Sequence, residues 1–130
     1  MNEANKENER FDLNRPLYQQ IVERIKQQLT NGSLPPGARI ASVRELALEY
    51  GVNPNTMQKA LSELEREGYL YSERTAGRFV TADESLISRL KDEQLDTAVR
   101  GFVERMMELG VKSRELPDIL AHRLRKTEGK

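Results

Sequence analysis

The sequence contains no cysteine and only one histidine, and these shortages exclude several kinds of site. Without cysteine the chain has no disulfide, no thiolate zinc ligand and no cysteine nucleophile. The one histidine, His122, stands in the polar run AHRLRK, so we expect no metal site, with Asp92, Glu93 and Asp96 as weak ligands at most. No spacing supplies the paired acid and base or the activated nucleophile that catalysis needs, so we expect neither an enzyme nor a cofactor.

Net charge and long apolar runs are missing as well. Lysine plus arginine and aspartate plus glutamate number 21 each, so the formal net charge is zero. This balance argues against a non-specific polycationic binder of nucleic acid, but it leaves local basic patches open. No apolar run approaches the roughly 18 residues of a membrane span, and the polar start of the chain does not resemble a secretory signal. We therefore expect a cytoplasmic protein with no membrane partner.

Regular apolar spacing predicts three helices in the first half of the chain. A stripe from Pro16 to the Asn31-Gly32 stop marks the first helix, and a loop with an extended exit at residues 38–40 follows. Ser42, with a glutamate three residues later, has the capping-box spacing that opens a second helix. Asn53 caps a third, with Pro54 at its first position. The residues expected to face the core are Leu17, Ile21, Val22, Ile25, Leu29, Val43, Leu46, Ala47, Tyr50, Met57, Ala60, Leu61 and Leu64.

Two short extended runs, YLYSE and RFVT, follow the third helix and predict a small hairpin with its tip at residues 74–77. Three helices followed by a β-hairpin make a winged helix, a variant of the helix-turn-helix. We therefore predict a mainly α fold with a small β-hairpin. A flexible arm is expected over residues 1–13, a winged helix-turn-helix over 14–82 and a two-helix tail over 83–130. The apolar pattern alone fits an ordinary helical hairpin equally well.

The polarity of the third helix favours DNA recognition over a merely soluble hairpin. Its first turns carry groups that bind base edges or phosphates, while its acids collect in the second half, SELEREG. A helix selected only for stability would carry its acids at the start and its bases at the end. Wing and loop arginines could add contacts to phosphates or a minor groove. The predicted DNA-binding residues are Arg39, Ser42, Arg44, Asn53, Asn55, Thr56, Gln58, Lys59, Arg74, Gly77 and Arg78.

Several ordered blocks between Pro16 and Val80 resemble the GntR family of bacterial transcription regulators. They read GSLPPGARI from Gly32, SVRELA from Ser42, GVNPNT from Gly51 and ALSELEREGYL from Ala60. The resemblance implies a winged helix that binds an operator as a dimer, with family contacts on Arg44 and on residues 53–56. The short tail and the Asn-Pro-Asn-Thr run resemble the YtrA-type subfamily.

Three positions depart from the usual family pattern. Ala41 stands where the family has proline, and Asn53-Pro54 replaces Ser-Arg, which removes one expected phosphate-binding arginine. In the wing, Arg78 stands where the family has threonine, and it could replace some of the lost positive charge.

The tail is expected to form a helix over residues 84–109 and a shorter helix capped by Ser113. It is too short to enclose a ligand pocket within one subunit. We interpret its apolar stripe as a dimerisation surface. Two alternatives are that the stripe covers the winged helix of the same chain, or that it lines a ligand cleft between two tails together with Met107. The dimerisation residues are Leu95, Val99, Phe102, Val103, Met106 and Leu109.

Together these features predict a sequence-specific transcription regulator, a repressor, that binds a palindromic double-stranded DNA operator as a homodimer. A small-molecule effector is left open and unidentified. The alternative is a winged-helix module that binds other proteins and does not bind DNA specifically.

Overall fold

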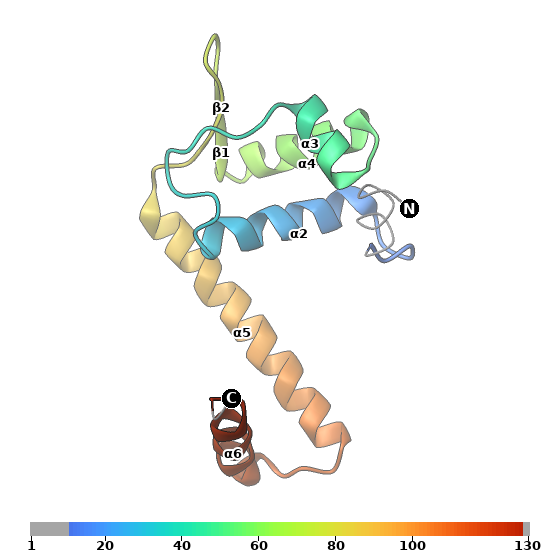
Figure 1. The fold of residues 1–130 in the computed structure, drawn as a ribbon, viewed down its shortest axis with the longest axis vertical. Helices are drawn as coiled ribbons and strands as arrows, with labels where there is room; N and C mark the ends of the chain where they lie inside the picture. Colours follow the sequence, from blue (N-terminus) through green and yellow to red (C-terminus); the bar gives the residue numbers. More distant parts are fainter. Residues whose placement is uncertain (1–10, 129–130) are drawn as a thin grey trace. The chain divides into compact units, whose positions relative to one another are not determined.

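The computed structural model describes residues 11–128 and has the architecture expected from the sequence. Three helices and a two-stranded antiparallel hairpin are followed by a long helix, a 3-10 turn and a last helix (Figure 1). This order confirms the predicted fold class of a winged helix with a helical tail. The elements are α2 (Leu17–Thr30), α3 (Val43–Tyr50), α4 (Pro54–Arg66), β1 (Leu70–Glu73), β2 (Gly77–Val80), α5 (Glu84–Glu108), η1 (Ser113–Glu115) and α6 (Leu116–Glu128).

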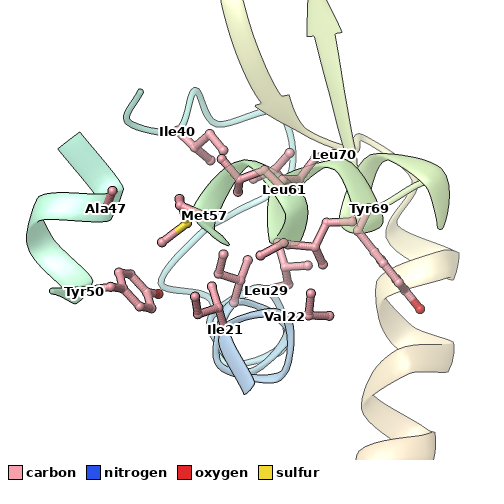
Figure 2. Packing of buried hydrophobic residues seen from close by; sticks show 14 of the residues in the cluster. Ile21, Val22, Leu29, Ile40, Ala47, Tyr50, Met57, Leu61, Tyr69 and Leu70 are labelled. Carbon is pink, nitrogen blue, oxygen red and sulfur yellow. The ribbon is translucent and has the colours of Figure 1, made fainter. Parts of the chain in front are cut away.

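The core lies between α2, α3 and α4, and the predicted stripes supply most of it. Figure 2 shows side chains from the three helices pointing toward one another. All four core positions predicted for α4 are inaccessible to solvent, whereas Leu17, Val43 and Leu46 are only partly buried at its edge. Each fully buried aliphatic side chain contributes about 1.5–3 kcal/mol to folding, so this small core can hold the three helices together.

Local caps set where α3 and α4 begin. The Ser42 hydroxyl accepts a hydrogen bond from the Glu45 amide (3.1 Å) and donates one to the Glu45 carboxylate (3.0 Å). The Asn53 side chain accepts from the Asn55 amide (2.7 Å). Between them Gly51 ends α3 with a φ of 69°, in the left-handed region that a side chain disfavours. The tight turn that orients α4 against α3 is therefore encoded locally.

The wing consists of β1 and β2 and is held on its second side by the extended loop before α3. Leu70 pairs with Val80 and Glu73 with Gly77. On the other edge of β2, the amide of Val80 donates to the Ala38 carbonyl (2.8 Å), and that of Ile40 to the Arg78 carbonyl (3.0 Å). The predicted extended exit at residues 38–40 is confirmed, and its pairing ties this loop to the wing.

The N-terminal segment that was expected to be a flexible arm carries a core residue at its end. Phe11 is 5% exposed, and the Arg24 guanidinium lies 4.0 Å from the centre of its ring. The buried Gln20 side chain accepts from the Asp12 amide (2.7 Å) and donates to the Asp12 carbonyl (2.6 Å). Phe11 and Asp12 thus contact α2, whereas Leu13 is exposed. Residues 1–10 of the expected arm lie outside the described residues.

The chain divides into two compact units at Lys91–Asp92, inside α5. The reason is that the first turns of α5 belong to the winged-helix core: Leu90 is buried, and Leu86 and Ile87 pack against the same cluster. In the second unit, Gly110 follows α5 with a φ of 85°. Ser113, expected to cap the last helix, is instead the first residue of η1, and α6 starts at Leu116.

Candidate nucleic-acid interface

The first turn of α4 presents polar groups and an unopposed positive dipole end to solvent. No acidic residue stands in this turn. Backbone amides at a helix start bind anions, because they lack helical partners and lie at the positive end of the dipole. Met57 points into the core, and the predicted contact residues around it are exposed apart from the half-buried Thr56: Asn53, Asn55, Gln58 and Lys59.

Besides Asn53, which caps α4, two of these side chains already have partners within the protein. Gln58 Nε2 donates to Ser62 Oγ (2.9 Å), and Lys59 Nζ lies 4.1 Å from the centre of the Tyr18 ring. Tyr18, the second residue of α2, lines a shallow surface hollow with Leu17, Asn55, Thr56 and Lys59. Tyr18 is not among the site residues predicted from the sequence. Helical spacing places it beside the core stripe of its own helix, but it does not show that the start of α4 lies next to it.

A larger groove of about 680 Å³ separates the wing from the start of α3. Arg39, Ser42 and Arg74 line it, as does the wing tip. Gly77 has a φ of 109°, and a Cβ built on it would lie 3.0 Å from Arg39 Nε. The positive φ favours a glycine here, and the Arg39 guanidinium lies over it. The structure thus brings the loop arginine, the α3 cap and the wing together.

The four predicted arginines fall into two groups. Arg39, Arg44 and Arg74 are exposed, and none of them forms an ion pair with a residue in the described range 11–128. The side chain of Arg78 is only 17% exposed, and its Nε lies 2.8 Å from Glu65 Oε1. Three cations are therefore open to a partner, while the fourth is paired with α4.

The acidic second half of α4 is neutralised by cations of the protein itself. Glu63 pairs with Arg66, and Glu67 pairs with Lys26 at 3.2 Å. The hydrogen bond from Arg66 lowers the pKa of Glu63. Burial raises the pKa of Glu65, but hydrogen bonds from Arg78 and Ser72 outweigh this and hold that pKa below its ordinary value. The lowered pKa values favour the ionised forms of Glu63 and Glu65. The arginines without ion pairs lie instead near the wing and the start of α3, where Glu45 and Glu73 also line the groove.

Comparison with known proteins agrees with this geometry. The family model for bacterial regulatory proteins of the gntR family matches residues 17–80. The HTH-type transcriptional regulator YhcF of Bacillus subtilis (strain 168) is 38% identical over 106 residues, which cover 82% of this chain and 88% of that protein. The chain belongs to the gntR family. It has the winged-helix DNA-binding domain of these transcription regulators, which are not enzymes, as the sequence predicted.

Two further members show how far the similarity extends. The HTH-type transcriptional repressor YtrA of the same organism is 42% identical over 66 residues, about half of each chain (51%). A solved GntR family transcriptional regulator from Listeria monocytogenes superposes with a TM-score of 0.78 at 32% identity and covers 86% of this chain and 98% of that one. The winged helix and the short helical tail therefore occur together in other members.

The described part of the chain contains neither a candidate membrane span nor a candidate metal-ion cluster. No helix there combines the length and the apolar character that crossing a bilayer requires. Nor do any three histidine or carboxylate side chains among residues 11–128 lie close enough together to hold a metal ion.

Proposed function

We propose that this regulator is a homodimeric repressor that binds a palindromic DNA operator through the start of α4 and the wing, and acts in the cytoplasm, where that DNA is. The observation that carries the proposal is the charge arrangement: three exposed arginines have no ion-pair partner in the described structure, and the first turn of α4 contains no acidic residue. The similarity to YtrA, a transcriptional repressor, supports the direction of regulation.

In this proposal the start of α4 enters a major groove. Asn55, Thr56 and Gln58 would meet base edges, because residues near the start of a recognition helix reach deepest. Arg44 and Lys59 would hold phosphates, and Ser42, the cap of α3 two residues before Arg44, would add a further contact. Arg74 at the wing tip, with Gly77 allowing the close approach of the backbone, would reach the adjacent minor groove.

The dimer would form through the apolar stripe of the tail. Among residues 92–128, the described part of the second unit, no side chain is fully buried. Leu95, Val99, Phe102 and Leu109 are 40–69% exposed. With the half-buried Met106 they alternate in steps of four and three residues, the spacing of a helix that packs along a second helix. Each Leu or Phe buried in that contact would contribute roughly 1.5–3 kcal/mol, which favours the dimer.

The test is a binding titration on duplexes from the promoter region of the protein's own gene. We expect tight binding to one inverted repeat at moderate salt and weak binding to a scrambled duplex of equal composition. A duplex with a single half-site should bind much more weakly, because the dimer loses one of its two contacts. Equal binding to all three duplexes, or to none, would reject the proposal and favour a protein-binding winged helix.

Repression is tested separately in a reporter strain. Supplying the protein should lower transcription from the promoter that contains the inverted repeat, and Arg44→Ala should relieve this. A rise in transcription would make the protein an activator.

A further inference from the structure

Three side chains join the wing to the candidate recognition helix α4. The Glu65 carboxylate on α4 accepts from Arg78 Nε on β2 (2.8 Å) and from the Ser72 hydroxyl on β1. Arg78 and Ser72 are themselves a cross-strand pair of the hairpin. One carboxylate thus binds both strands of the wing at the same level. We call Glu65, Ser72 and Arg78 the wing latch.

The pleat of the hairpin dictates that these side chains face α4. Side chains alternate between the two faces of a strand, so residues two apart share a face. Leu70 and Val80 point into the core, and Ser72 and Arg78 are two residues away from them on the same face. Tyr71 and Phe79 stack on the other face with their ring centres 5.6 Å apart. Arg78 therefore points toward α4 and not along the outer face of the wing.

The position of Glu65 on α4 completes the contact. It follows Leu61 by four residues, so it lies on the edge of the buried face of α4, beside the hairpin. The Glu65 and Arg78 side chains are 29% and 17% exposed, so water screens their attraction less than that of a pair on the open surface.

We propose that Arg78 is a positioning residue of the operator complex: together with Glu65 it holds the wing at a set angle to α4 and does not itself bind phosphate. Wing contacts then come from Arg74 and from Arg39, which lies over Gly77. This inference rests on the proposed contact between wing and operator. It also explains how an arginine is accommodated at this wing position, since its charge is compensated within the domain.

The change in operator affinity caused by Glu65→Gln distinguishes a positioning role of Arg78 from direct contact with phosphate. Glu65 is a negative charge close to the DNA-binding surface, so on charge alone Glu65→Gln should tighten binding to DNA. If Arg78 bound phosphate, the same substitution would also free that cation and tighten binding further. If the wing latch positions the wing, Glu65→Gln should instead weaken binding. A wing that has lost its carboxylate partner must be ordered during binding, and this ordering costs free energy.

The experiment measures operator affinity against salt concentration for wild type, Glu65→Gln, Arg78→Gln and the double variant, with Glu63→Gln as the matched control. Glu63 lies on the same helix and pairs with Arg66, not with the wing. We expect Glu65→Gln and Arg78→Gln each to weaken binding by roughly threefold to tenfold, the range for loss of one ordinary hydrogen bond. The double variant should be no weaker than Arg78→Gln, and Glu63→Gln should bind as well as wild type or better.

The salt dependence gives a second readout. Loss of one phosphate contact lowers the slope of log K against log salt by about 0.9. We expect all four variants to keep the wild-type slope. Tighter binding by Glu65→Gln, or a slope reduced by about 0.9 in Arg78→Gln, would overturn the proposal.

Hydrogen exchange on the free proteins tests the latch without DNA. Amides of residues 70–80 should exchange faster in Glu65→Gln than in wild type, while those of α2 should not change. Unchanged wing exchange would count against the latch, and faster exchange throughout the domain would show general destabilisation and reject a local role. If the wild-type protein fails to bind the inverted repeat, the proposed function is refuted. If the wild-type protein binds but the variants behave as direct contact predicts, only the positioning role of Arg78 is refuted.

Discussion

The Asn53 side chain holds the first turn of α4 in place, because its Oδ1 accepts a 2.7 Å hydrogen bond from the amide of Asn55. Both residues are exposed, so the contact lies on the surface that is proposed to meet DNA. The same asparagine thus serves the stability of the helix and the shape of the site.

Replacing Asn53 tests how much this cap contributes to the stability of the protein. Asn53→Ala is expected to lower the free energy of unfolding by about 0.5–2 kcal/mol, as other cap removals do. Asn53→Ser keeps a capping oxygen and is the matched control, with stability close to that of wild type. Thermal or urea unfolding followed by circular dichroism measures both. An alanine variant as stable as the serine variant would mean that the cap contributes nothing.

Arg44 should contribute to affinity and not to folding. It is exposed and has no ion-pair partner among residues 11–128. We expect Arg44→Ala to weaken operator binding by about 1–3 kcal/mol, with an unchanged melting temperature. Arg66→Ala, an exposed arginine at the acidic end of α4, is the control and should bind nearly as well as wild type. Fluorescence anisotropy titrations report the difference, and equal losses in both variants would contradict the assigned surface.

Phe102→Asp should shift the protein toward monomer. A carboxylate placed within the proposed tail contact would have to lose its water without a partner, which is unfavourable. DNA affinity should fall with it, because a monomer binds only one half-site.

The control for this variant carries the same change of charge off the stripe. Thr97→Asp lies between two stripe positions on the opposite side of α5 and should remain dimeric. Sedimentation equilibrium or light scattering measures the state. If Phe102→Asp is as dimeric as Thr97→Asp, the tail stripe is not the interface.

Acid should destabilise the protein partly through Asp83. Its carboxylate caps α5, accepting from the amides of Ser85 (3.1 Å) and Leu86 (3.2 Å) and from the Ser85 hydroxyl (2.7 Å). These hydrogen bonds, the Ser85 hydroxyl foremost, lower the pKa of Asp83 from its ordinary 3.8. The stabilisation is complete above the ordinary pKa and is lost as pH falls through the lowered one.

Asp83→Asn keeps an oxygen for the cap but does not titrate. We therefore expect its free energy of unfolding to fall less steeply with decreasing pH below about pH 4 than that of wild type. Urea unfolding at several pH values measures this slope, and equal slopes in the two proteins would refute the role of Asp83.

Local sequence determined most of the elements of this protein and the identity of its family. Stripe spacing, the Ser42 and Asn53 caps and the glycines after helices act within a few residues, so the three helices and the long tail helix lie close to their predicted bounds. The family blocks carry the turn between α3 and α4, which is also local. These signals act whatever distant segments each element packs against.

Only the tertiary structure decided which segments meet. Arg78 reads as a free cation in the sequence, but it faces Glu65, thirteen residues away, because the pleat that buries Val80 turns Arg78 to the same side. Phe11 and Leu90 join the core of the first unit, because each finds apolar neighbours that no local pattern reveals. Contacts between distant residues depend on how whole elements pack, and that information is spread over the entire chain.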